Sequence, residues 1–180
     1  MGAQPPAGKR RAALLEILAV ALQLERDGRH VFLELAKRAK DRRARRMLRR
    51  LAAEELEHFG ILEETFNEVR GPDTWLTAQE VAARYGKRLL QLAPVKRVRR
   101  VRKATDRSMT EHKALALGIT SEMESLAFYR KAARIEKDSV YRDLLLDFVA
   151  FEEGHLRILE TERANLDRIT RWARTPRRRR

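Results

Sequence analysis

The sequence predicts an all-α fold, a four-helix bundle built from two antiparallel helical hairpins. Its 180 residues include only five Pro and eight Gly, while the helix-forming residues Ala, Leu, Glu, Arg and Lys dominate. Apolar residues recur at three- and four-residue steps along four long segments, which is the period of an amphipathic helix. The apolar content of 43% is enough to build a core, so the 37% of charged residues do not indicate disorder.

The four predicted helices follow one another in two closely connected pairs. The first runs from about Arg11 to Lys40 and the second from about Arg42 to Val69, after which Gly71-Pro72 ends the pattern. The third runs over about 108–136 and the fourth over about 139–173. Since only a few residues join the helices of each pair, each pair is predicted to be an antiparallel hairpin.

The segment between the hairpins is predicted to carry the chain across the bundle. A short helix is predicted from Thr77 to Gln91, with Thr77 as its N-cap, Glu80 completing a capping box and Pro94 as its stop. The resulting organisation is a disordered tail at 1–10, a bundle at 11–173 (hairpin one 11–69, crossover 70–107, hairpin two 108–173) and a basic tail at 174–180.

The two hairpins are related by an internal duplication. An offset of 97 residues aligns the two halves of the chain without a gap. Periodicity alone would align apolar residues, but it would not align acidic and imidazole side chains as well. The aligned pairs include Glu25–Glu122, Glu55–Glu152, His58–His155, Leu18–Leu115, Phe32–Tyr129, Asp41–Asp138 and Leu48–Leu145.

Six of the aligned polar residues occupy positions where the helical period demands a core residue. Four carboxylates facing one core repel one another, and a buried unpaired carboxylate is strongly destabilising. Arg29 is the only cation on these stripes near the middle, whereas two divalent metal ions would balance four negative charges. We therefore predict a two-metal site, and any catalytic centre, formed by Glu25, Glu55, His58, Glu122, Glu152 and His155.

The spacing of these residues suggests their roles. In each Glu-x-x-His pair the two side chains leave one helix face about one turn apart, so that one can bridge two metal ions while the other binds a single ion. This is the arrangement of di-iron carboxylate bundles. An oxygen-rich site with two imidazoles suits two Fe ions (Fe²⁺/Fe³⁺), with Mn or Zn as substitutes. We expect Glu55 and Glu152 to bridge, Glu25 and Glu122 to be terminal, and His58 and His155 to donate nitrogen.

The remaining polar residues near these stripes have simpler interpretations. Tyr129 is explained by core packing, and it could also donate a hydrogen bond or an electron near the site. His30 and His112 lack the paired spacing and are predicted not to be ligands. The carboxylates expected on solvated faces are Glu54, Glu57, Glu63, Glu124 and Glu153.

Several stretches resemble one known family. These are Leu24–Gly28 with Phe32 and Ala36, Leu51–His58, Glu122–Tyr129 and Phe151–His155. Over residues 12–68 and 108–165 the chain resembles the rubrerythrin group of the ferritin-like superfamily. The resemblance implies a ferritin-like bundle whose di-iron site reacts with hydrogen peroxide or dioxygen.

The sequence departs from that group in two ways. Typical rubrerythrins also carry a rubredoxin-like iron centre held by four Cys, and this sequence contains no Cys, so the resemblance implies a separate electron-donor protein. Typical members also have a further Glu where Ser125 stands, and the repeat partner of Ser125 is Gly28. We hypothesise that these two small residues leave room for a bound oxygen species.

Three functions are therefore considered. The first is a di-iron peroxidase or ferroxidase in oxidative-stress defence, and the second is iron storage in a multimeric ferritin-like assembly; a homodimer or larger homo-oligomer is expected in both. The formal charge of +14 raises a third, a nucleic-acid-associated protector. The basic runs lack interleaved aromatic residues, which favours solvated faces over a nucleic-acid site.

The remaining exclusions concern membranes and thiol chemistry. No apolar run approaches the length of a membrane span, and nothing resembles a signal peptide, so a cytoplasmic location and no membrane partner are expected. The absence of Cys excludes disulfides, thiolate metal sites and Cys nucleophiles within this sequence.

Overall fold

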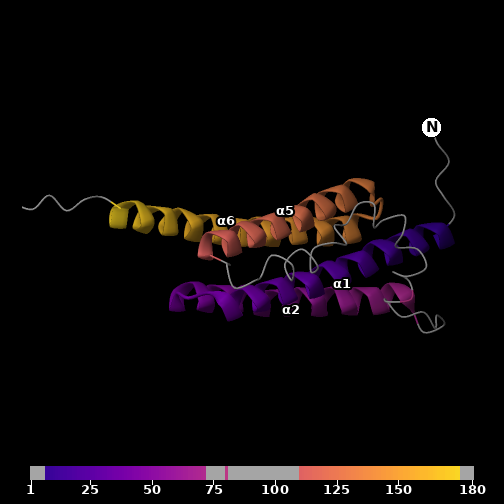
Figure 1. Cartoon of the computed structure of the whole chain (residues 1–180). Helices are drawn as coiled ribbons and strands as arrows, with labels where there is room; N and C mark the ends of the chain where they lie inside the picture. Colours follow the sequence, from indigo (N-terminus) through magenta and orange to yellow (C-terminus); the bar gives the residue numbers. More distant parts are fainter. Residues whose placement is uncertain (1–6, 72–79, 81–109, 175–180) are drawn as a thin grey trace, which may run out of the picture.

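The computed structural model describes residues 7–71, 80 and 110–174. Within these residues the chain forms four helices and no strand, which confirms the all-α bundle (Figure 1). The helices are α1 (Ala7–Arg38), α2 (Arg42–Arg70), α5 (Glu111–Ile135) and α6 (Ser139–Arg174).

The four helices form the two predicted hairpins. α1 packs chiefly on α2, and α5 packs chiefly on α6. The hairpins then lie against each other, mainly through α1 and α5 and to a smaller extent through α2 and α6 (Figure 1). The site is therefore assembled from two separate hairpins, as the duplication in the sequence predicts.

The helix ends agree with the predicted ends to within a few residues. α1 begins at Ala7, so it reaches into the segment expected to be a disordered tail, and it ends two residues before the predicted Lys40. Gly71 ends α2 with a φ of 65°, a conformation that favours glycine, and its N–H donates to the carbonyl of Asn67. The predicted short helix at 77–91, most of the crossover, residues 1–6 and residues 175–180 lie outside the described residues.

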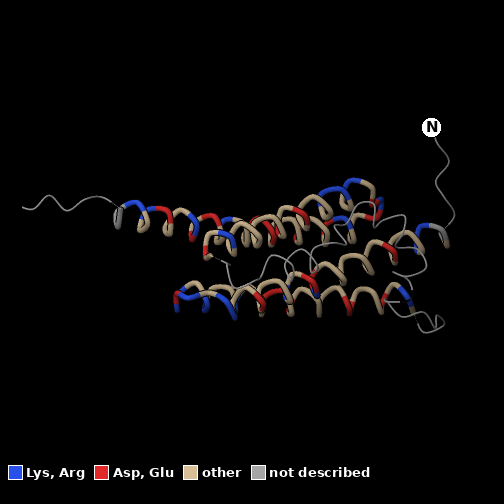
Figure 2. Tube along the Cα trace, viewed as in Figure 1, with Lys and Arg blue, Asp and Glu red and all other residues tan. Residues whose placement is uncertain are grey.

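The apolar core is divided into two clusters. One includes Leu18, Phe66 and Phe148. The other includes Phe32 and Leu159. On each of the four helices, the predicted ligands fall between the residues of the first cluster and those of the second, so the polar centre has apolar packing on both sides along the bundle axis. Figure 2 shows that most of the basic residues of α2 lie in its N-terminal half, whereas Arg70 lies in its last turn.

Asp41 connects the first two helices and is the N-cap of α2. Its carboxylate accepts hydrogen bonds from the backbone N–H of Ala44 at 2.8 Å and of Arg43 at 2.7 Å. These bonds, that from Ala44 first, lower the pKa of the Asp41 carboxyl below its usual value. The cap satisfies two of the N–H groups that the first turn of a helix otherwise leaves without a partner.

Asp41→Ala is expected to lower the free energy of unfolding by about 1 kcal/mol, because it removes the capping oxygen. Urea denaturation at pH 7 measures this change. Asp41→Asn is the matched control, since it keeps a side-chain oxygen and should lose much less. Equal losses in the two variants would mean that capping is not what Asp41 contributes.

Candidate metal centre

All six predicted ligands lie together in the centre of the bundle. Glu25 comes from α1, Glu122 from α5, and one Glu-x-x-His pair from each of α2 and α6. Every one of the six is buried, and the most exposed of them, His58, has only 7% of its surface accessible. The structure therefore places these residues as the sequence predicts, at a point that only the meeting of the two hairpins creates.

The six residues form two groups that share one member. Glu25, Glu55 and His58 make the first group, and Glu55, Glu122, Glu152 and His155 make the second. Within each group, one ligand atom from every residue lies within 4.8 Å of the others. Glu55 thus stands where a bridging ligand would stand. Glu152, for which a bridging role was also predicted, belongs to the second group alone.

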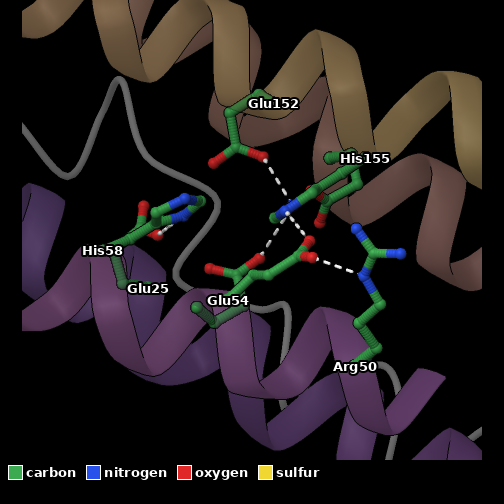
Figure 3. A network of polar contacts seen from close by, with 8 residues as sticks. Glu25, Arg50, Glu54, His58, Glu152 and His155 are labelled. Atoms are coloured by element: carbon green, nitrogen blue, oxygen red, sulfur yellow. Dashed lines mark hydrogen bonds and ion pairs between the residues drawn. The ribbon is translucent and has the colours of Figure 1, made fainter. Parts of the chain in front are cut away.

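In both histidines, Nδ1 is the ring nitrogen that lies nearest to the carboxylates of its group. Nδ1 of His155 lies 2.9 Å from Oε2 of Glu122 and 3.3 Å from Oε1 of Glu55 (Figure 3). Nδ1 of His58 lies 3.3 Å from Oε2 of Glu25. The two rings stack with their centroids 5.4 Å apart. Each group therefore presents one imidazole nitrogen and several carboxylate oxygens to a common centre.

Burial of so many acids has a clear electrostatic effect. Desolvation first, and then the charges of Glu25, Glu122 and Glu152, raise the pKa of the Glu55 carboxyl well above 4.5. Burial lowers the pKa of His155, but the hydrogen bond to Glu122 and the nearby carboxylate charges outweigh it and raise that pKa above 6.5. Positive charge is needed at this centre, and Arg29 does not provide it because its side chain is exposed.

The residues present fit a pair of metal ions. Oε2 of Glu25 and Nδ1 of His58 are buried, and neither has a hydrogen-bond partner among the described residues. A buried polar atom without a partner is destabilising unless something else binds it. Carboxylate oxygen with imidazole nitrogen is the ligand set of iron, manganese and zinc sites.

Tyr129 and Gly28 lie next to two of the predicted ligands. The hydroxyl of Tyr129 is buried and donates a hydrogen bond to Oε1 of Glu25, as the sequence suggested. Desolvation first, and then the charges of Glu25 and Glu152, raise the pKa of the Tyr129 hydroxyl well above 10. Gly28 lies beside Glu55: a Cβ added to it would be 3.1 Å from Cδ and Oε2 of Glu55. The room beside Gly28, which we had expected to hold an oxygen species, is taken by this carboxylate.

Glu54, which we expected on a solvated face rather than among the ligands, belongs to neither ligand group but is only partly exposed. Its side chain is 26% exposed, accepts a hydrogen bond from Nε of Arg50, and lies 3.3 Å from Nε2 of His155. Glu57 and Glu63 are exposed as expected. Glu124 and Glu153 are partly buried.

His30 and His112 belong to neither of the two groups that could hold a metal ion. His112 instead pairs with Asp167 at 2.8 Å, far along α5 from the centre. Phe32 packs edge-on against His155, with ring centroids 6.2 Å apart.

An open pocket of about 320 Å³ adjoins the centre between α2 and α6. The two imidazoles and Glu54 form its polar wall, and the rest of its lining is Ala150, Phe151, Gly154 and Ile158. It offers a mainly apolar path to both histidines, large enough for a small neutral molecule.

Comparison with known proteins identifies one family. A family model described as Rubrerythrin matches residues 16–162. Comparison with curated proteins and with solved structures gave no significant match. Among the residues that the structure describes, no helix is both long enough and apolar enough to cross a bilayer.

Proposed function

The chain belongs to the rubrerythrin family, and on this premise we propose that it is a non-haem di-iron oxidoreductase that reduces hydrogen peroxide or dioxygen. The observation that supports the proposal is the pair of buried ligand groups that share Glu55. A shared carboxylate between two groups is what a two-metal redox centre requires. Iron suits the oxygen-rich ligand set and the redox role, and manganese or zinc would be substitutes.

The bound iron ions would supply the two electrons with which hydrogen peroxide and two protons become two molecules of water. Glu25, Glu55, Glu122 and Glu152 would balance the charge of two divalent ions and, with His58 and His155, would hold them. Tyr129 fixes Oε1 of Glu25, whereas Oε2, which has no hydrogen-bond partner among the described residues and lies 3.3 Å from Nδ1 of His58, faces the centre. The open, mainly apolar pocket beside His58 and His155 would give a small neutral oxidant access to the two histidines.

Two partners complete the proposed reaction. Electrons would return to the centre from a donor protein outside these 180 residues, because the sequence contains no Cys to hold a rubredoxin-like centre. A homodimer or larger homo-oligomer is also proposed. Its support is the number of large apolar side chains that α2 and α6 expose, among them Leu56 at 51%, Val140 at 70% and Leu146 at 48%.

Iron storage is the alternative use of the same centre. The observation that favours it is the absence of a further carboxylate at Ser125, which makes the ligand set of the two halves more alike than in typical rubrerythrins. In this case the protein would oxidise iron with dioxygen and pass it into a multimeric assembly. Storage would differ from the proposed oxidoreductase activity in the preferred oxidant and in the amount of iron that the protein retains.

Anaerobic loading with Fe²⁺, followed by metal analysis and absorption spectroscopy, tests the proposal. We expect about two irons per chain, as in other di-iron carboxylate bundles, and oxidation by hydrogen peroxide that is faster than oxidation by air. Faster reaction with air, with many irons retained per chain, would favour storage instead. Failure to bind iron, or bound iron that reacts with neither oxidant, would contradict both uses.

A further inference from the structure

The two halves of the duplication differ in the side chain that contacts each of the two histidines from outside the ligand groups. The offset that aligns the ligands also aligns Glu54 of α2 with Phe151 of α6. Each of these residues crosses to the histidine of the other hairpin. Glu54 lies 3.3 Å from Nε2 of His155, whereas the ring of Phe151 stacks on His58 with centroids 4.5 Å apart and planes 14° apart.

Glu54 is itself held in position. Its Oε1 accepts a hydrogen bond of 2.7 Å from Nε of Arg50, one turn earlier on α2, and its Oε2 is the oxygen that faces His155 (Figure 3). The other half has no equivalent pair, because the duplication aligns Arg50 with Asp147. The series of contacts from Arg50 through Glu54 to His155 therefore has no counterpart at His58.

These contacts affect how well Nδ1 of His155 can bind a metal ion. Its Nδ1 faces the carboxylates of the second group, while its Nε2 faces Glu54. When the N–H remote from a metal donates to a carboxylate, the ring is held in one tautomer and one orientation and becomes a stronger donor. Phe151 fixes the plane of the His58 ring, but a phenyl ring offers no acceptor comparable to a carboxylate.

We infer that Glu54 is a positioning residue that makes the two metal positions unequal. The position formed by Glu55, Glu122, Glu152 and His155 binds its ion more tightly and fills first. The position formed by Glu25, Glu55 and His58 binds more weakly and exchanges its ion more readily. The larger number of ligand residues in the second group acts in the same direction. This inference rests on the two-metal centre of the proposed function.

Anaerobic calorimetric titration of the metal-free full chain with Co²⁺ tests the inference. We expect two binding steps of different affinity in the unaltered protein. Glu54→Gln should weaken the tighter step by about 10- to 100-fold, the usual effect of removing a carboxylate behind a metal-bound histidine, and leave the weaker step unchanged. Arg50→Gln should weaken the same step by a smaller factor, and it keeps the test decisive if Glu54→Gln folds poorly.

Phe151 provides the matched control. Phe151→Leu should leave the tighter step unchanged, and Phe151→Glu should strengthen the weaker step by placing a carboxylate behind His58. Two equal steps in the unaltered protein, or a Glu54→Gln variant whose two steps weaken equally or not at all, would overturn the inference.

The titration and the reaction with oxidants separate the inference from the proposed function. Because the steps are measured with Co²⁺ and no oxidant, unequal steps in a protein whose iron does not react with peroxide or air would overturn the proposed activity alone. Equal steps in a protein that reduces peroxide would overturn the inference alone. A chain that takes up no Co²⁺ would overturn the inference whatever its reaction with iron.

Discussion

Glu55→Gln is expected to remove metal binding at both positions, because Glu55 is the one residue that belongs to both ligand groups. An amide has one oxygen and no charge, so it cannot bridge two cations. The affinity at each position should fall by more than about 100-fold, which is the upper end of the loss caused by removing a residue that only supports a ligand. Metal analysis after anaerobic loading with Fe²⁺ and removal of free ion measures the result.

The same substitution is expected to stabilise the metal-free protein. Burial and then the neighbouring carboxylates raise the pKa of Glu55 well above 4.5 in the folded state. A raised folded pKa means that stability is complete below the unfolded pKa and is lost as the pH rises through the folded pKa. Glu55→Gln removes this loss, so its advantage in free energy of unfolding should grow from pH 5 to pH 8. Urea denaturation at pH 5 and at pH 8 measures this difference in the free energy of unfolding between the two proteins.

Glu57→Gln is the control for both measurements. Glu57 lies two residues along α2, and it is exposed to solvent. Its substitution should change neither metal content nor the stability of the metal-free protein at either pH. Retention of two ions by Glu55→Gln would contradict the assignment of Glu55 as the shared ligand, and a loss of metal-free stability at pH 8 would contradict the electrostatic account.

The helices and the gathering of six acidic and imidazole side chains in the core could be predicted because one physical conflict identifies those positions. A carboxylate at a core position of an amphipathic helix is destabilising by itself, and the duplication shows the conflict at matching positions in both hairpins. Residues such as Glu122 are then identified without any knowledge of how the hairpins pack. The sequence also predicted a short connection between the first two helices, whereas the capping of α2 by Asp41 is seen only in the structure.

The position of Glu54 could not be predicted in the same way. Its sequence position lies beside the core stripe of α2, where the helical period leaves it on the flank and indicates solvent. Its environment depends on which part of α6 lies across from that flank, and α2 contacts α6 less extensively than α1 contacts α5. The alignment of Glu54 with Phe151 was available in the sequence, but only the structure shows that both residues face a histidine.

The role of Gly28 likewise depends on a distance between two helices. The sequence shows a small residue one turn after Glu25, but not what fills the space that it leaves. The carboxylate of Glu55 lies in that space, so close that a methyl group on Gly28 would be within 3.1 Å of it. Gly28 is therefore expected to be needed for the position of the shared ligand.

Gly28→Ala is expected to weaken metal binding while leaving the metal-free helix more stable. The new methyl group would force the Glu55 carboxylate to shift by a few tenths of an ångström, and metal ligands tolerate little displacement. The affinity for metal at both positions should fall on the order of tenfold. This is the lower end of the loss seen when a residue that supports a metal ligand is mutated. In the metal-free protein Ala is favoured over Gly inside a helix by up to about 1 kcal/mol. Co²⁺ titration and urea denaturation measure the two effects.

Gly118→Ala is the matched control, because it makes the same change inside α5 without touching a ligand. A Cβ at Gly118 would meet Leu159 at 3.4 Å, an ordinary contact distance at the edge of the tight range. The control should therefore gain helix stability and keep the metal affinity of the unaltered protein. If both variants bind Co²⁺ like the unaltered protein, Glu55 has freedom to move away from Gly28. In that case the shared carboxylate is positioned by the metal ions rather than by the helix packed against it.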